Sequence, residues 1–312
     1  MPYMRKTLTT ILLLAGLFVY ADRDSKHGSA PASWSNQVEK DLVNLIAKNE
    51  QARQVYGSVI KRLRRSGVPA AYAWQVFSNP GIKIETNISD RFAKPAEKMD
   101  YTDYRRIFVN TKRIDGGVKF YNEHAELLHN VAKQYGVDPF LILSFVGVET
   151  QYGLYASSYP VFNSLHTIIH NIPRRAKWAE DEMVAWFMIC RVDGLGPHDV
   201  KGSYAGAFGY GQFMPTSFKS YAVDMDGDGV REPFEWADVM ASIANYLLKR
   251  GNYDISSTDF SENSVNWRAV WKYNPSKNYV RAVLELRSQL SKPSKNLSTA
   301  PVSSPRIIKD YS

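Results

Sequence analysis

Cysteine is almost absent from this 312-residue sequence, which contains only Cys190. A single cysteine excludes an intrachain disulfide, and its apolar surroundings in WFMICRV favour a buried, unreactive thiol over a nucleophile. Stability must therefore come from packing, for which a hydrophobic content of 44% suffices.

The sequence is also poor in three patterns that mark other classes of protein. Beyond residue 21 no apolar run is long enough to cross a bilayer, and sustained alternation of apolar and polar residues is scarce. No Gly-Lys-Ser/Thr follows a glycine-rich stretch, which excludes a phosphate-binding P-loop. The expected fold is therefore mainly α (α+β), with a small β part at most, and no internal repeat is found.

The N-terminal residues 1–21 have the pattern of a signal peptide. Two basic residues precede an apolar stretch that ends at Val19-Tyr20-Ala21, a small-x-small cleavage site. We expect a flexible lead-in at 22–33, a folded region at 34–290 and a disordered Ser, Pro and Lys rich tail at 291–312. An uncleaved leader would hold the protein at the membrane, and no cysteine near residue 22 offers a lipid anchor.

The formal net charge of +8 suits an anionic partner. Nucleic acid, an anionic lipid surface and an acidic cell-wall polymer all have the required charge. Because the leader predicts export, no nucleic-acid partner is expected. Solubility alone would also account for the charge.

Apolar periodicity predicts most of the helices. Three- and four-residue spacings mark helices within 38–65, 70–77, 120–135, 178–190, 236–250 and 279–290, whereas 82–116 is less periodic and is expected to be loop with short helices. Asp138-Pro139 adds an N-cap and first-turn proline for a further helix, with Gly153 as its expected end.

That helix contains Glu149 within the stretch LILSFVGVETQYG, where residues 141–148 are otherwise almost entirely apolar. An ionised carboxylate in such surroundings costs several kcal/mol unless it is paired or neutralised. A carboxylic acid in an apolar wall holds its proton toward neutral pH and can act as a general acid, for example on a departing glycosidic oxygen. A lone Glu in an apolar helix can also be structural, so the neighbouring motifs decide.

A second motif, KGSYAGAFGYGQFMPTSF at 201–218, alternates glycines with aromatic residues. Glycine lets the backbone approach a ligand closely, and aromatic rings offer flat faces on which sugar rings can lie. A glycine-rich turn packed on the core is the alternative.

The order of several motifs resembles the membrane-bound lytic murein transglycosylase B family. The motifs are GVETQYG at 147–153, IPRRA at 172–176, KGSYAGAFGYGQFMPTSF, YAVDMDGDG at 221–229, ANYLLKRGNY and WKYNPSKNYVRAVL. The resemblance covers roughly residues 100–290 and only loosely the N-terminal helices. It implies a lysozyme-like helical core at 101–290, an accessory helical part at 34–100 and a periplasmic location.

The resemblance also implies an activity and a site. Family members cleave the β-1,4 bond between N-acetylmuramic acid and N-acetylglucosamine without water, leaving 1,6-anhydromuramic acid ends. Glu149 would be the sole acid/base, peptidoglycan strands the substrate and other cell-wall enzymes the partners. The matching substrate-binding positions are Ser203, Gln212, Tyr246, Tyr273, Asn274, Tyr279, Arg174 and Arg175. An aromatic core and a solvated arginine pair remain open alternatives, as do a hydrolytic muramidase and a non-catalytic wall-binding scaffold.

A third motif, DMDGDGVREPFE at 224–235, fits the calcium-loop pattern Asp-x-Asp-x-Asp-Gly with a Glu six residues after the Gly. Asp224, Asp226 and Asp228 would supply carboxylates and Val230 its carbonyl. Glu235 would close the loop by this pattern, whereas the family resemblance, with its longer loop, implies Asp238. We expect a structural Ca²⁺, and a solvated acidic turn is the alternative.

His166 and His170 have the spacing of a helical zinc pair, but Thr167 stands where a metalloprotease would have Glu. No third ligand is apparent, so structural histidines are the preferred interpretation.

Overall fold

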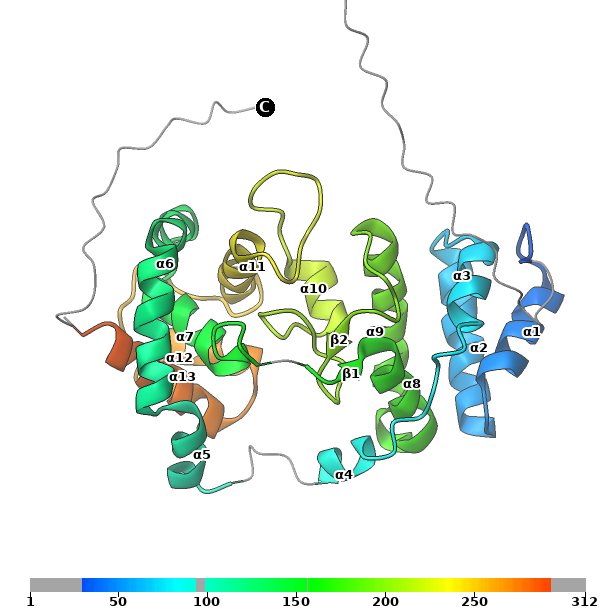
Figure 1. The fold of residues 1–312 in the computed structure, drawn as a ribbon, viewed down its shortest axis with the longest axis horizontal. Helices are drawn as coiled ribbons and strands as arrows, with labels where there is room; N and C mark the ends of the chain where they lie inside the picture. Colours follow the sequence, from blue (N-terminus) through cyan, green and yellow to red (C-terminus); the bar gives the residue numbers. More distant parts are fainter. Residues whose placement is uncertain (1–29, 94–98, 156, 293–312) are drawn as a thin grey trace, which may run out of the picture.

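The computed structural model describes residues 30–93, 99–155 and 157–292, and the predicted mainly helical fold is confirmed (Figure 1). The predicted signal peptide lies outside the described residues, as do most of the lead-in and nearly all of the tail. The helices are α1 Asn36–Ile46, α2 Glu50–Arg65, α3 Ala70–Phe77, α4 Ile88–Ala93, α5 Tyr101–Phe108, α6 Thr111–Tyr135, α7 Pro139–Thr150, α8 Val161–Asn171, α9 Pro173–Val192, α10 Pro215–Tyr221, α11 Trp236–Lys249, α12 Val265–Tyr273 and α13 Lys277–Leu290.

In the described residues the sheet structure is confined to two short strands. Strand β1, Tyr159–Pro160, pairs antiparallel with β2, Lys201–Gly202. This ladder joins the segment that follows α7 to the start of the glycine-rich motif, so the small β part lies beside the candidate site.

The predicted helix over 38–65 is two helices. Helix α1 ends at Ile46, and Asn49 caps α2 by accepting a hydrogen bond of 2.8 Å from the Ala52 N–H. Helices α1, α2 and α3 pack beside α8 and α9 at one end of the molecule (Figure 1). The N-cap Asn49, followed by Glu50, marks this break in the sequence, but apolar spacing continues across it and hides the break.

Helix α8 was not predicted from apolar spacing. Asn163, Thr167 and His170 give it a polar side, but this side is buried as well, and Asn163 and Thr167 form hydrogen bonds with the backbone of residues 81–85. The short helix α12 was missed too, and α6 begins nine residues earlier than expected, with a kink at His124. The region 82–116 contains α4, α5 and the start of α6, which agrees with loop and short helices.

Helix α7 runs through the centre of the fold. The Asp138 carboxylate accepts the Leu141 N–H at 2.7 Å and Pro139 opens the first turn, as the sequence predicted. Residues 141–148 are all buried, and α7 packs against α6 and α13. The helix ends at Thr150, three residues before the expected Gly153, because Gln151 adopts a left-handed conformation and returns its N–H to the Gly147 carbonyl.

The two histidines of α8 are structural within the described fold. His166 Nδ1 lies 2.7 Å from the Tyr56 hydroxyl on α2, and burial keeps the pKa of that hydroxyl far above its ordinary value, so tyrosine is the donor. His170 Nε2 accepts the Lys48 N–H at 3.1 Å, while its Nδ1 donates to the His166 carbonyl at 2.8 Å. Both rings are therefore neutral and join α8 to the α1–α2 corner.

These rings predict a loss of stability in acid. Burial lowers the pKa of His166 to about 3, from an ordinary 6.5. Between these two values the unfolded chain binds a proton that the folded chain does not, so the free energy of unfolding falls as pH falls. At pH 5 this one group should remove about 2 kcal/mol. Urea unfolding measures the free energy of unfolding at pH 7.5 and at pH 5.0. The decrease between the two pH values should be about 2 kcal/mol smaller in His166→Gln than in the wild type.

The matched control is His129→Gln. His129 also contacts a tyrosine hydroxyl, that of Tyr121 at 2.7 Å, but its ring is exposed. This control should leave the pH-dependent loss unchanged. Equal losses in the wild type and His166→Gln would refute the assignment.

Candidate functional site

The carboxyl group of Glu149 emerges where α7 leaves the core. The eight residues before it are buried, whereas Glu149 is partly exposed. Its Oε1 accepts a hydrogen bond from the hydroxyl of Tyr279, which lies on α13 and is 2% exposed. Burial, and then the charge of Glu149, raise the pKa of Tyr279 well above its usual range, so the hydroxyl stays a donor.

A second tyrosine approaches the same carboxylate. Tyr273, the last residue of α12, has its pKa raised by burial and then by the charge of Glu149. Its hydroxyl donates to the carbonyl of Gly211, and its ring centroid is 4.7 Å from that of Phe145 on α7. Tyr273 therefore joins the acid-bearing helix to the glycine-rich segment.

Tyr246 and Asn274 complete this wall. The ring of Tyr246, on α11, lies 4.8 Å from that of Tyr273, and its hydroxyl donates to the Lys272 carbonyl at 2.6 Å. Asn274 is the C-cap of α12 and is partly exposed. The structure thus brings three predicted tyrosines together, and Tyr246, which is 6% exposed, also belongs to the aromatic core.

The glycine-rich segment folds back on itself beside α7. Backbone bonds join Phe208 to Phe213, and Gly209 has a φ of +74° with the Pro233 carbonyl only 2.6 Å from where a Cβ would lie. Only glycine fits this close approach. The Thr150 hydroxyl donates to the Tyr210 carbonyl at 3.2 Å, so the residue after Glu149 is tied directly to the segment.

Ser203 and Gln212 lie at the two ends of this turn. The Ser203 Oγ accepts the N–H groups of Ala205 and Ala207 at 3.3 and 3.1 Å, which orders the turn and leaves the hydroxyl proton to be donated. Gln212 has a φ of +49° and donates to the Gly209 carbonyl at 2.9 Å.

A hollow of about 450 Å³ borders the end of α7. It is lined by Thr150, Gly153, Tyr155, Ser157, Asp199, Val200, Lys201, Gly209, Tyr210, Gln212 and Phe234. The side chain of Tyr155 is 67% exposed and that of Phe234 is 42% exposed, which is unusual for large rings. Rings open to solvent beside a polar hollow suit the faces of sugar residues. The sequence analysis did not identify Tyr155 or Phe234, although the first lies two residues after the GVETQYG motif.

Arg174 and Arg175 lie in the first turn of α9 and are exposed. The guanidinium carbon of Arg175 lies 4.8 Å from the ring centroid of Phe92 on α4, and that ring is 4.9 Å from Tyr204 in the glycine-rich segment. Arg175 thus contacts Phe92, which in turn contacts Tyr204 of the glycine-rich segment. Phe92 was missed because 82–116 shows no clear periodicity.

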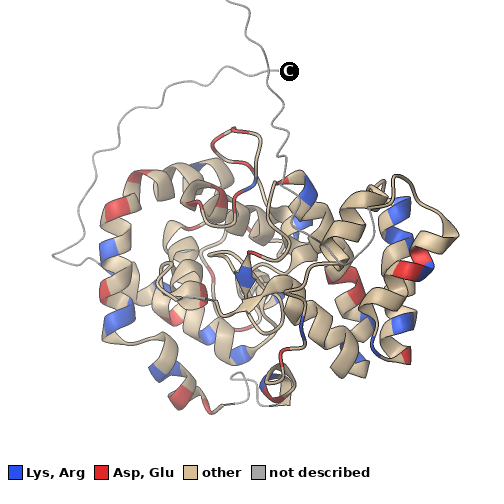
Figure 2. Ribbon diagram, turned by 45° about the vertical axis from the view of Figure 1, so that its right-hand side comes forward, with Lys and Arg blue, Asp and Glu red and all other residues tan. Residues whose placement is uncertain are grey.

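The acidic loop between α10 and α11 brings carboxylates into two groups. Oxygens of Asp224, Asp226 and Asp238 lie within 4.8 Å of one another, and so do those of Asp226, Asp228 and Glu232. Figure 2 shows the acidic segments of this loop in red. Among the described residues Glu235 belongs to neither group; it is exposed at the N-cap of α11, whereas Asp238 is 2% exposed.

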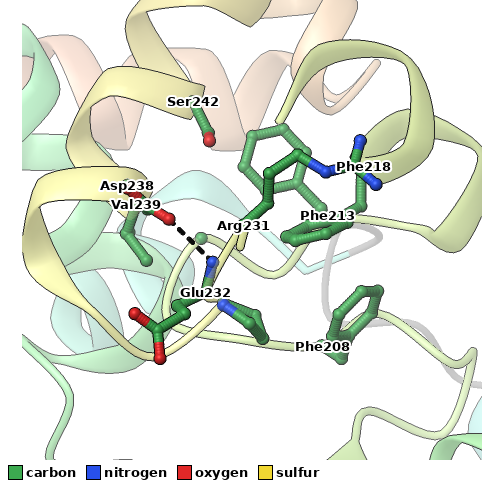
Figure 3. Close-up of a pocket in the computed structure, with 10 residues that line it drawn as sticks. Phe208, Phe213, Phe218, Arg231, Glu232, Asp238, Val239 and Ser242 are labelled. Atoms are coloured by element: carbon green, nitrogen blue, oxygen red, sulfur yellow. Dashed lines mark hydrogen bonds between the residues drawn. The ribbon is translucent and has the colours of Figure 1, made fainter. Parts of the chain in front are cut away.

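The chemistry of this loop fits a hard divalent cation. Burial is the main cause that raises the pKa of Asp238. Two backbone hydrogen bonds oppose the rise, and the negative charges of Asp226 and Asp224 add to it. A bound cation would relieve this repulsion between carboxylates. Asp238 also accepts the N–H groups of Met225 and Glu232, each at 2.7 Å. Figure 3 shows the bond from Glu232. Val230 lies in the same loop, where its N–H donates to Asp228 at 2.8 Å.

The loop is anchored on the core at its far end. Arg231 forms an ion pair of 2.6 Å with Asp193, which ends α9 and is 5% exposed. Figure 3 shows Arg231 beside Phe213 and Phe218.

In the described part of the chain no helix has the length and apolar character that a membrane span requires.

Comparison with known proteins agrees with this geometry. Residues 51–260 match the family model described as the transglycosylase SLT domain. Membrane-bound lytic murein transglycosylase B of Escherichia coli is 38% identical over 148 residues, which are 47% of this chain and 41% of that protein. The chain thus spans less than half the length of this curated relative.

Two solved structures resemble most of this fold. Soluble lytic transglycosylase SltB1 of Pseudomonas aeruginosa has 29% identity and a TM-score of 0.68, covering 76% of this chain and 98% of that one. The lytic transglycosylase Slt35 of Escherichia coli in complex with calcium has 24% identity and a TM-score of 0.69, covering 78% and 94%. Because the family model covers well over half of its length, this chain belongs to the transglycosylase SLT domain family.

Proposed function

We propose that the protein is a lytic transglycosylase that cleaves the β-1,4 bond between N-acetylmuramic acid and N-acetylglucosamine in peptidoglycan. The observation that carries the proposal is the position of Glu149, a partly exposed acid at the end of a buried helix, beside a hollow lined by open aromatic rings. The names of the relatives support the same activity.

In the proposed reaction Glu149 acts twice. It first gives its proton to the glycosidic oxygen of the departing N-acetylglucosamine, and the C1–O bond breaks. It then takes the proton of the muramoyl C6 hydroxyl as that oxygen bonds to C1, which leaves a 1,6-anhydro ring and returns the acid to its starting state. Tyr279 donates a hydrogen bond to Oε1 and so orients the carboxyl group for both transfers.

The remaining site residues would bind the strand. Ser203 and Gln212 can donate to sugar oxygens or acetamido groups, and the guanidinium groups of Arg174 and Arg175 can meet lactyl or peptide carboxylates. Asn274, Tyr246 and Tyr273 would form the wall behind the acid. The predicted leader at 1–21 would export the chain to the periplasm, where it could meet its substrate and other cell-wall enzymes.

The acidic loop would hold a structural Ca²⁺ through Asp224, Asp226, Asp228, the Val230 carbonyl and Asp238. The ion would neutralise the crowded carboxylates and fix the start of α11. It would not take part in proton transfer, which is assigned to Glu149.

Product analysis tests the proposed reaction. The purified protein should release muropeptides from sacculi, and mass spectrometry should show 1,6-anhydromuramic acid ends, which weigh one water less than reducing ends. Reducing ends in their place would make the protein a hydrolytic muramidase. Binding to sacculi without soluble product would make it a wall-binding scaffold.

A further inference from the structure

A buried arginine contacts α7, the helix that contains Glu149. Arg113, on α6, is only 9% exposed, and its guanidinium donates to the carbonyl of Gly147 and, at 3.3 Å, to that of Ile107. Burial lowers the pKa of Arg113. The ion pairs found among the described residues do not include it, so this buried cation is held chiefly by carbonyl oxygens.

A tyrosine is wedged against the same point. Gln151 and Tyr152 have φ values of +53° and +60°, a region that non-glycine residues rarely adopt. The chain reverses there and turns the Tyr152 ring back under α7, where its hydroxyl is buried and has no hydrogen-bond partner among the described residues. A Cβ on Gly117 or Gly147 would lie only 2.5 or 2.6 Å from that hydroxyl, so the two glycines form a slot for the ring.

Gly147 is the point where these contacts meet. Its carbonyl accepts the Arg113 guanidinium and the Gln151 N–H, and its missing side chain makes room for Tyr152. A cation at the C-terminal turn of a helix also complements the helix dipole. Gly147 lies two residues before Glu149, so the clamp fixes the turn from which the acid projects.

We propose that Arg113 and Tyr152 are positioning residues that hold the last turn of α7, so that the Glu149 carboxyl group stays against Tyr279 and faces the substrate. This inference rests on the proposed function. Neither residue touches the substrate; each acts on Glu149 through the backbone of Gly147. Misplacing a catalytic group by about 1 Å can cost on the order of 10²-fold in rate.

The test compares Arg113→Met with Arg287→Met. Arg287 forms an ion pair of 2.5 Å with Asp138, at the opposite end of α7 from Glu149. Arg113→Met should lower kcat on a soluble GlcNAc-MurNAc-pentapeptide chain by about 10²-fold, with KM within threefold of the wild type. Arg287→Met should lower the melting temperature but keep kcat within threefold. Arg113→Lys, which keeps a buried cationic donor, should recover at least tenfold of the loss.

Three results would overturn the proposal: an unchanged kcat in Arg113→Met, an equal loss of kcat in Arg287→Met, or no recovery in Arg113→Lys. If Arg113→Met does not fold, Tyr152→Leu is tested in its place. An unchanged kcat in Tyr152→Leu would refute the positioning role of Tyr152. Failure of the proposed function is separate, because the wild type would then release no anhydro product. In that case a crystal structure of Arg113→Met or Tyr152→Leu tests the positioning role without an activity assay. A Tyr279–Glu149 hydrogen bond that is unchanged in the variant would overturn this role.

Discussion

Glu149→Gln should lower the rate of release of anhydromuropeptides from sacculi by about 10³-fold, the scale expected for loss of a general acid–base. The amide keeps the size of the side chain and an oxygen for the Tyr279 hydroxyl, so the fold and the hydrogen bond should survive. What the amide cannot do is give and take a proton. Both steps of the proposed reaction should therefore fail together, with binding to sacculi retained.

The matched control is Glu285→Gln. Glu285 is also a partly buried Glu that accepts a tyrosine hydroxyl, that of Tyr101 at 2.7 Å, but it pairs with Arg105 on α5 instead of lining the site. Its replacement should leave activity within about twofold, because a surface pair contributes little to stability. Mass spectrometry of released muropeptides over time measures both variants, and the melting temperature checks their folding. More than a tenth of the wild-type rate in Glu149→Gln would remove Glu149 from the acid role.

The sequence alone was sufficient to identify Glu149 as a candidate. An acidic residue at the end of an apolar run is conspicuous because burial of its charge is costly, and the cost is local to one helix. The acidic loop was equally visible, since its carboxylates follow one another at fixed spacing. In both cases the chemistry depends on residues that are close in the chain.

Arg113 and Phe92 could not be found in this way. Arg113 lies in the stretch 82–116, which shows no clear periodicity, and only the packing of α6 on α7 shows that its guanidinium meets Gly147. Phe92 belongs to a six-residue helix whose contact with Tyr204 joins positions far apart in sequence. Tertiary contacts of this kind leave no periodic trace.

The choice between Glu235 and Asp238 shows the same limit. Spacing alone favours Glu235, which completes the calcium-loop pattern, whereas the structure turns Asp238 into the acidic group from the first turn of α11. The acidic group is thus completed by a residue of the following helix, beyond the end of the standard pattern.

Calcium should raise the melting temperature by several degrees. A ligand that binds only the folded chain stabilises it, and an exported calcium site with a dissociation constant of about 10⁻⁴ M would gain about 2.7 kcal/mol at about 10 mM calcium. For a folded body of this size the gain corresponds to about 5 °C. Thermal unfolding in EDTA and in 10 mM calcium (about 100 times that constant) measures it.

Asp238→Asn should remove most of this calcium-dependent shift, because one charge of the Asp224, Asp226 and Asp238 group is lost while the side chain keeps its shape. In EDTA the same variant should melt below the wild type, because its amide oxygen can accept only one of the two N–H groups, Met225 or Glu232, that the Asp238 carboxylate accepts. The calcium-dependent shift of each protein is therefore the quantity to compare. The control Asp254→Asn changes a partly exposed turn aspartate outside the loop and should leave the calcium shift intact. A wild-type shift below about 1 °C, or a full shift in Asp238→Asn, would mean that the loop is a solvated acidic turn, since saturation of even a weak structural site must appear in the melting temperature.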